Sequence, residues 1–269
     1  MAANQSAKHP VVFVHGLWLH AESWKNWIDF FREHGYEAVA VSWPGDSETT
    51  EATRRKPEAV AGYGVTEIAD HIAGQIKILR QKPILIGHSF GGLLVQNLLG
   101  RDLAAAAVAI DPAPIKGVSE LPMSALKSAL PVLGNPFNFN RAISLTEPQF
   151  RFGFTNAVSE QEAKDLYTKY AMPAPARLLF QAATATLNPN SATKVNLTNT
   201  TRGPLLLISG AEDHIVPPVL VRSALKAYRK FSAVTEFKEF AGRGHSLTID
   251  SGWRELADYV LGWLNAKGF

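Results

Sequence analysis

The chain has 269 residues, of which 46% are hydrophobic and 19% are charged, and its formal net charge is +3 at pH 7. This length and apolar content suffice for one large core, and the mild charge gives no reason to expect a nucleic-acid partner. No run of 18 apolar residues occurs, so the sequence predicts no membrane span. The absence of cysteine and of an apolar leader favours a cytoplasmic location. Nothing in the pattern specifies an oligomeric state.

The first apolar run, residues 11–14, is typical of a buried strand, and it breaks at Gly16. Glycine allows the following backbone to turn sharply, so the N–H of Leu17 is predicted to be one donor of an oxyanion hole. Trp18 and His20 adjoin this turn. We therefore expect both side chains to line a substrate pocket.

Further along the chain, strand-like and helix-like segments alternate. Residues 37–43 and 104–110 are short apolar runs typical of strands. Residues 65–79 and 253–264 place apolar side chains three and four positions apart, which predicts helices with one buried face. This alternation predicts an α/β fold with a mostly parallel twisted sheet flanked by helices, whose active site lies at the carboxyl ends of the strands.

The sequence G-x-S-x-G occupies residues 87–91 and places Ser89 between an apolar run, 83–86, and a helical segment, 92–99. A serine on such a strand–turn–helix is exposed at the helix N-terminus, where developing negative charge is favoured. Ser89 is therefore predicted to be a nucleophile. The N–H of Phe90, the next residue, is predicted to be the second oxyanion donor.

Residues 115–201 interrupt the alternation, because they are rich in proline and aromatic side chains and contain no convincing strand. A stretch of this length without secondary structure is uncommon in a compact domain. We therefore predict a helical cap inserted between two strands, with residues 1–114 and 202–269 forming the core. Such a cap would cover the nucleophile, exclude water and supply an apolar pocket.

A serine hydroxyl needs a base and an acid to become reactive. His245 lies on a loop before the last helix and is the best candidate for the base. Asp213 follows the apolar run 205–208. The chain order serine, aspartate, histidine is the one expected when the nucleophilic serine lies on such a strand–turn–helix. Two other acids remain open. Glu212 is adjacent but is expected to point elsewhere, whereas Asp111 ends another strand and could reach the same histidine.

The chain resembles the α/β-hydrolase superfamily over nearly its whole length. The matching motifs are His15-Gly16, the turn around Ser89, Gly210-x-x-Asp213 and Gly244-His245. The segment from His15 to Trp24 also resembles a loop of plant methyl-esterases and hydroxynitrile lyases. The resemblance implies an eight-stranded, mostly parallel sheet with a helical cap. Only about ten residues precede the first strand here, so the family's first two antiparallel strands have no room.

These observations predict a carboxylic ester hydrolase acting on a small molecule with an apolar or aromatic portion. Ser89 attacks the acyl carbon, His245 moves the proton and Asp213 orients the imidazole, with an acyl-enzyme as intermediate. The N–H groups of Leu17 and Phe90 hold the oxyanion. No motif for a metal or a cofactor is present, so none is expected.

The same residues are compatible with other chemistry on lactone, amide, thioester or carbon–carbon substrates, or with haloperoxidase or perhydrolase activity. A hydroxynitrile lyase would need a lysine near the base, but the nearest cation to His245 is Arg243. A non-catalytic small-molecule receptor is a further alternative. It would have no need of all three triad residues.

Overall fold

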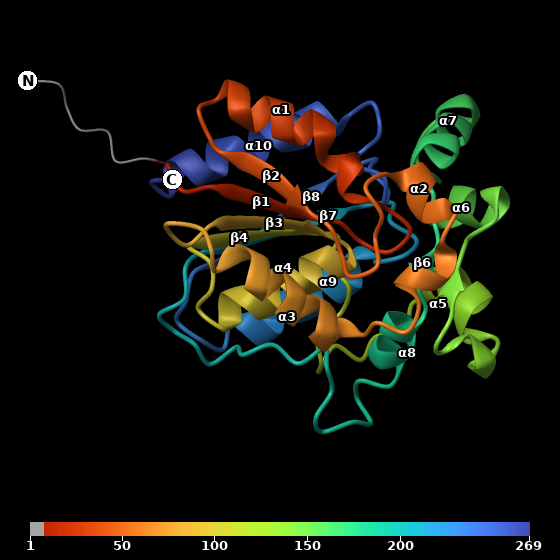
Figure 1. Cartoon of the computed structure of the whole chain (residues 1–269). Coiled ribbons are helices and arrows are strands. Elements are labelled where there is room, and N and C mark those ends of the chain that lie inside the picture. Colours follow the sequence, from red (N-terminus) through yellow and green to blue (C-terminus); the bar gives the residue numbers. More distant parts are fainter. Residues whose placement is uncertain (1–7) are drawn as a thin grey trace, which may run out of the picture.

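Short, mostly apolar segments form one parallel sheet in the order β2-β1-β3-β4-β7-β8 within residues 8–269, the part of the chain that the computed structural model describes. The strands are β1 (Val11–Val14), β2 (Ala38–Val41), β3 (Ile84–His88), β4 (Ala106–Ile110), β7 (Leu205–Gly210) and β8 (Thr235–Phe240). Every residue of the four central strands is buried, because helices cover both faces of the sheet. All strands run in the same direction, so their carboxyl ends meet at one edge (Figure 1).

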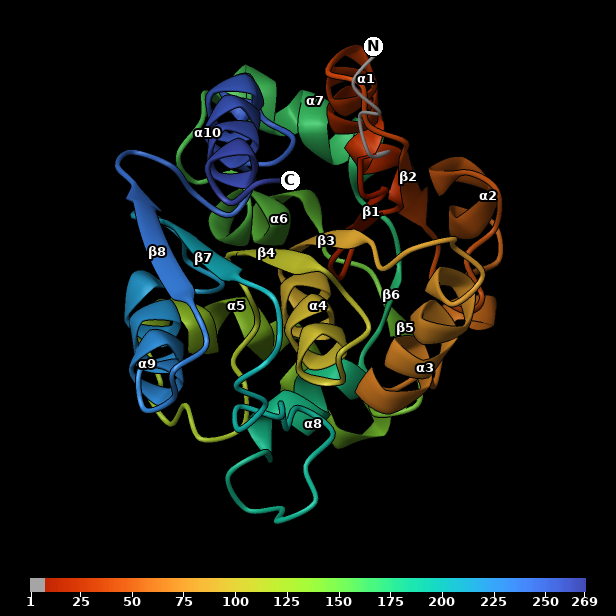
Figure 2. The same cartoon turned by 90° about the vertical axis from the view of Figure 1, so that its left-hand side faces the viewer.

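Two layers of helices sandwich the sheet (Figure 2). One face carries α1 (Lys25–Glu33) and α10 (Trp253–Ala266), and the other carries α3 (Val65–Ile76), α4 (Phe90–Gly100) and α9 (Pro218–Tyr228). Short helical turns lie between β1 and α3: η1 (Ala21–Trp24), α2 (Thr50–Arg54) and η2 (Pro57–Val60). Phe13 of β1 packs in the core with Trp27 and Leu256, whereas its neighbour Val12 packs in the opposite core with Ile72. Successive strand side chains point to opposite faces, so one strand supplies both cores.

The predicted fold class is confirmed, since the sheet is parallel and helices flank it. β2 and β4 are shorter than the apolar runs 37–43 and 104–110 that predicted them. Within the described residues no strand precedes β1. The sheet of this part of the chain therefore has six strands, fewer than the eight that the resemblance implies.

Most of the regular secondary structure in the segment between β4 and β7 is helical. It contains α5 (Met123–Leu133), η3 (Pro136–Asn138), α6 (Glu147–Gly153), α7 (Glu160–Tyr170) and α8 (Arg177–Ala183). Two strands of two residues each, β5 (Ala142–Ile143) and β6 (Ala174–Pro175), also pair antiparallel within it. The expectation of no strand here was therefore wrong, because a two-residue pairing has no detectable sequence pattern. These helices lie beyond the carboxyl ends of the sheet (Figure 1). The division into a core and a cap at residues 115–201 stays a prediction.

Among residues 8–269, no helix combines the length and the apolar character needed to cross a membrane. The predicted lack of an apolar leader concerns residues 1–7, which lie outside the described residues. The cytoplasmic location stays a prediction.

Candidate active site

Ser89 lies on the turn between β3 and α4 and has φ = 56° and ψ = −121°. Non-glycine residues rarely adopt positive φ, so the surrounding structure must hold this turn in place. The N–H of Ser89 donates to the carbonyl of Ile110 at 2.9 Å, and its own carbonyl accepts from the N–H of Ala113 at 2.9 Å. Two hydrogen bonds to the β4 end thus fix the backbone of Ser89.

Three glycines make this turn possible because no Cβ fits at their positions. A Cβ on Gly87 would lie 2.2 Å from the carbonyl oxygen of Gly91, and a Cβ on Gly91 would lie 2.1 Å from that of Val14. A Cβ on Gly16 would lie 2.6 Å from the Cβ of Ser89. The glycines therefore allow the loop after β1 and the start of α4 to close around the serine.

Two backbone amides next to the contact between Gly16 and Ser89 have no hydrogen-bond acceptor within the described residues. Neither the N–H of Leu17 nor that of Phe90 donates a hydrogen bond to any atom of residues 8–269. Phe90 is the first residue of α4, where an N–H has no partner inside the helix. Free amides on both sides of a serine are the feature that an oxyanion hole requires.

His245 and Asp213 form a fully desolvated pair. Nδ1 of His245 lies 2.6 Å from Oδ2 of Asp213, and both side chains are buried. The other carboxylate oxygen, Oδ1 of Asp213, accepts from the N–H groups of Ile215 at 2.7 Å and Val216 at 2.8 Å. These donors hold the carboxylate in one orientation and stabilise its negative charge.

The other imidazole nitrogen is unpaired. Nε2 of His245 is buried and has no hydrogen-bond partner within the described residues. It is therefore not hydrogen-bonded to Oγ of Ser89 in this structure. Hydrogen bonds of catalytic groups are often long without substrate and tighten in the complex. The free nitrogen is the one that a serine hydroxyl would need.

Contacts on both sides of the imidazole hold the His245 loop. Arg243 forms an ion pair with Asp250 and donates to the carbonyl of Gly252 at 3.0 Å. The N–H of the following residue, Ser246, donates to the carbonyl of Phe154 at 2.9 Å. The ring of Phe154 lies edge-on to the imidazole, with centroids 4.8 Å apart. Arg243 therefore stabilises the loop, and its charge is already paired.

Asp111, the alternative acid, also lies in this cluster. Its Oδ2 is 4.0 Å from Nδ1 of His245, beyond hydrogen-bond distance, and its Oδ1 accepts from the N–H of Gly210 at 2.7 Å. Burial, reinforced by the charge of Asp213, raises the pKa of Asp111 well above its usual range. The side chain of Glu212 is exposed. Of the three acids, Asp213 is therefore the one bonded to the imidazole.

The groups in the described residues that could hold a metal ion are His88, Asp111 and His245, whose ligand atoms lie within 4.8 Å of one another. All three are buried, and Nδ1 of His245 is already paired with Asp213. Burial lowers the pKa of His88 well below its usual range, so its imidazole is neutral. The neutral ring of His88 therefore packs beside His245, with ring centroids 4.5 Å apart.

A cavity of about 320 Å³ opens at Ser89 and Phe90. Its walls come from both the sheet end and the inserted segment, and they are mostly aliphatic. The other lining residues are Ala113, Pro114, Val118, Ser119, Glu120, Leu121, Pro122, Ala125, Leu126, Ala129, Leu133, Leu179, Ala182, Ala183, Thr186, Ile215, Val216 and Leu220. Glu120 is the one charged side chain among them. The α5 residues recur at three- and four-residue spacing, a pattern that does not distinguish a cavity wall from a core face.

Trp18 and His20, the residues expected to line the pocket, are not among the residues around this cavity. The indole N–H of Trp18 donates to the carbonyl of Ile143 at 3.0 Å, which joins the β1 loop to β5. The ring of His20 is buried and accepts from the N–H of Glu22 at 3.2 Å. Both side chains thus support the loop that carries Leu17.

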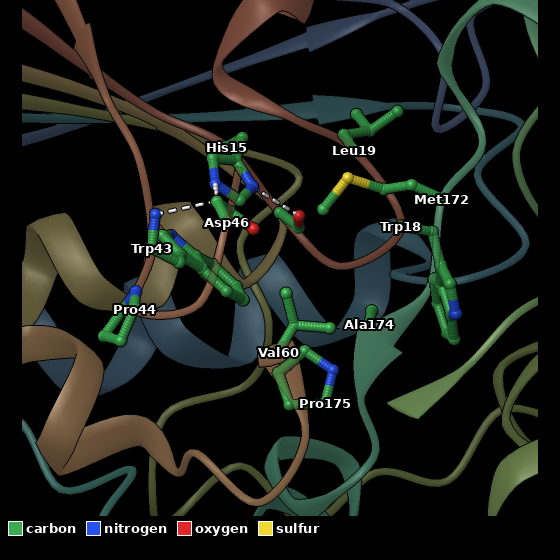
Figure 3. A pocket seen from close by; sticks show the side chains of 11 residues that line it. His15, Trp18, Leu19, Trp43, Pro44, Asp46, Val60, Met172, Ala174 and Pro175 are labelled. Atoms are coloured by element: carbon green, nitrogen blue, oxygen red, sulfur yellow. Dashed lines mark hydrogen bonds and ion pairs between the residues drawn. The ribbon is translucent and has the colours of Figure 1, made fainter. Parts of the chain in front are cut away.

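A much smaller cavity, of about 10 Å³, lies behind this loop and is lined by Trp18 and His15 among others (Figure 3). Nε2 of His15 lies 3.1 Å from Oδ2 of Asp46, which also accepts from the N–H of Trp43 at 2.8 Å. Nδ1 of His15 lies 2.9 Å from the carbonyl oxygen of Gly16. Both nitrogens are engaged, so His15 holds the turn and is not free to act as a base.

Comparison with known proteins identifies the family of the chain. The chain matches the alpha/beta hydrolase family over residues 11–259, and it belongs to that family. A (E)-2-((N-methylformamido)methylene)succinate hydrolase of Acinetobacter baylyi is 27% identical over 96 residues, which are 35% of this chain. The match spans 34% of the length of that curated relative.

Solved structures show the same fold over nearly the whole chain. A monoacylglycerol lipase of Paleococcus ferrophilus is 22% identical with a TM-score of 0.65, covering 96% of each chain. An extracellular alpha/beta-hydrolase of a Paenibacillus species is 22% identical with a TM-score of 0.67, covering 95% of this chain and 98% of its own. The latter is described as sharing structural and functional homology with tobacco salicylic acid binding protein 2. At this level of identity the likeness shows the fold, which esterases and lipases are among the proteins to share.

Proposed function

We propose that the protein is a serine hydrolase that cleaves a carboxylic ester with an aliphatic portion. The observation that carries this proposal is the buried pair of Asp213 and His245, joined at 2.6 Å. The second imidazole nitrogen has no hydrogen-bond partner in the described part of the chain. A strained serine, Ser89, lies at the end of an aliphatic cavity in the same site. A general base needs an imidazole nitrogen that is free to accept the proton of the nucleophile.

In the proposed mechanism, Nε2 of His245 removes the proton of Ser89 as Oγ attacks the ester carbonyl carbon. Asp213 holds the imidazole in the tautomer with its proton on Nδ1 and stabilises the imidazolium that forms. The N–H groups of Leu17 and Phe90 receive the oxyanion. The imidazolium then protonates the departing alkoxide, and a water molecule deprotonated by His245 hydrolyses the acyl-enzyme.

We propose that residues 115–201 act as a cap over this site. Support comes from the cavity walls, because α5 supplies Ala125, Leu126 and Ala129, while the sheet end supplies Ser89 and Val216. Apart from Phe90, the lining has no aromatic ring. An alkyl chain would therefore bury apolar surface there, and its binding would be stabilised by about 25 cal/mol for each Å² removed from water. The name of the monoacylglycerol lipase neighbour is consistent with such a substrate.

The test is hydrolysis of p-nitrophenyl esters of increasing acyl length by the purified protein and its Ser89→Ala variant. We expect the wild type to hydrolyse them and the variant to be inactive. A fluorophosphonate probe should label the wild type at Ser89 only. Ser119→Ala, which changes another serine of the same cavity, is the matched control and should retain labelling and activity. Equal hydrolysis by the wild type and Ser89→Ala would overturn the proposal.

A further inference from the structure

Asp111 has no role in the mechanism above, yet it is completely buried next to His245. It follows β4, whereas Asp213 follows the neighbouring strand β7, so the two carboxyl groups meet at the sheet end. Both approach Nδ1 of His245, Asp213 at 2.6 Å and Asp111 at 4.0 Å. Asp111 has φ = 41°, an uncommon value for aspartate, and its N–H donates to the carbonyl of Ile208 at 2.9 Å. The backbone is thus held in a strained conformation that keeps this carboxyl in the site.

The surroundings do not supply enough positive charge for two carboxylates. His88 is buried, and neither of its ring nitrogens has a hydrogen-bond partner within the described residues, so it contributes no charge. Arg243 acts on Asp111 only through space, since its guanidinium is bonded to Asp250 and to backbone carbonyls. His245 is neutral when it serves as a base. Two buried carboxylates that approach the same imidazole nitrogen repel each other strongly. One of the two carboxyl groups must therefore hold a proton.

The hydrogen-bond donors decide which carboxyl is protonated. Asp213 accepts from two backbone N–H groups and from the imidazole, and all three favour its ionised form. Asp111 accepts only from the N–H of Gly210, and its Oδ2 has no donor among residues 8–269. An unpaired oxygen beside a carboxylate is satisfied only when it carries a proton itself. Asp111 and Asp213 approach the same nitrogen, Nδ1 of His245, at 4.0 Å and 2.6 Å, so their carboxyl groups lie close together.

We propose that Asp111 is a positioning residue, held as a neutral carboxylic acid that donates its proton to Asp213. This inference rests on the proposed function. The acid that orients His245 is then a pair of carboxyl groups that share a single negative charge. One charge is what the imidazolium of the transition state needs. The donated hydrogen bond helps to fix the Asp213 carboxylate and moderates its basicity.

Asparagine at position 111 imitates the protonated acid, because its amide can donate to Asp213 and accept from Gly210. We expect Asp111→Asn to retain kcat/KM within about threefold and to keep the acidic limb of the pH profile in place. Asp111→Leu removes the donor, so we expect a loss of roughly ten- to hundredfold and an acidic limb shifted to higher pH. If Asp111→Asn loses as much activity as Asp213→Asn, Asp111 is ionised and the proposal is wrong. Full activity with an unshifted pH profile in Asp111→Leu would exclude a positioning role.

Infrared spectroscopy tests the protonation without relying on activity or on the folding of Asp111→Leu. We expect the wild type at neutral pH to show the C=O stretching band of a buried protonated carboxyl group, and Asp111→Asn to lack it. A wild type without this band would refute the proposal. The outcome is separable from that of the proposed function. An enzyme without esterase activity that still shows the band would refute the mechanism while leaving the protonation intact.

Discussion

Gly16 and Ser89 face each other so closely that a Cβ on the glycine would lie 2.6 Å from the Cβ of the serine. The contact joins the loop after β1 to the turn between β3 and α4. Leu17 follows Gly16 directly, so the contact holds the start of the Leu17 segment beside Ser89. The site thus depends on two loops that are more than 70 residues apart in the chain.

The first prediction concerns this contact. Gly16→Ala must push the loop away from Ser89 and displace the Leu17 amide, so we expect kcat to fall by about a hundredfold or more. KM should change little, since the cavity walls stay in place. Gly74→Ala is the matched control, because a Cβ there meets nothing within 4 Å. It lies inside α3 and is expected to keep full activity. Steady-state kinetics of both variants checks the prediction.

Removing the charge of Asp213 should disable the base. Asp213→Asn places an amide beside Nδ1 of His245 and favours the wrong tautomer, so we expect kcat to fall by about 10⁴-fold. Circular dichroism should show that the variant folds. Glu212→Gln changes the neighbouring exposed acid and should leave kcat unchanged. An active Asp213→Asn enzyme would mean that another group orients the imidazole.

Protonation of His88 should limit stability in mild acid. Burial lowers its pKa in the folded state well below the value of 6.5 expected in the unfolded chain. Below about pH 6.5 the unfolded state therefore binds more protons, and stability falls with falling pH by up to about 1.4 kcal/mol per pH unit from this residue. Above that pH its contribution is complete.

Asp111 opposes this trend between its unfolded and folded pKa values, because its folded-state pKa is raised. A variant without an ionisable group at position 88 isolates the contribution of His88 to the pH dependence of stability. We expect the difference in unfolding free energy between the wild type and His88→Phe to move in favour of the wild type from pH 5 to pH 7. Urea denaturation at several pH values measures it. A constant difference would contradict the assignment.

Filling the aliphatic cavity should change substrate preference. Ala129 lines the cavity from α5, and Ala129→Phe should reduce kcat/KM for long-chain esters by about tenfold, the effect of losing one or two buried methylene contacts. Acetyl esters should be affected less. Leu130→Phe enlarges the next side chain of the same helix, which is 58% exposed and does not line the cavity. Its chain-length profile should match the wild type, and a shared shift would exclude this cavity as the substrate site.

Much of the framework was predictable because its causes are local. Alternating apolar periods indicated the parallel sheet, and the spacing 87–91 indicated the strained turn at Ser89, since only glycine fits at both of its ends. The chain order of Ser89, Asp213 and His245 indicated which loops meet at the carboxyl ends. The pairing of β5 with β6 escaped detection, because two residues carry no period.

The sequence by itself determined which residue types stand at the strand ends, because strand period, turn chemistry and glycine sterics act over a few residues. Only the tertiary structure shows that Asp213, and not Asp111, is hydrogen-bonded to His245. Both residues follow neighbouring strands, and their distances to Nδ1 of His245 differ by 1.4 Å, which separates a hydrogen bond from a near contact. The tertiary structure also shows that residues of α5, and not Trp18 and His20, line the cavity at Ser89. An apolar helix face has the same sequence pattern whether it meets a core or a cavity, and packing of distant segments makes that choice.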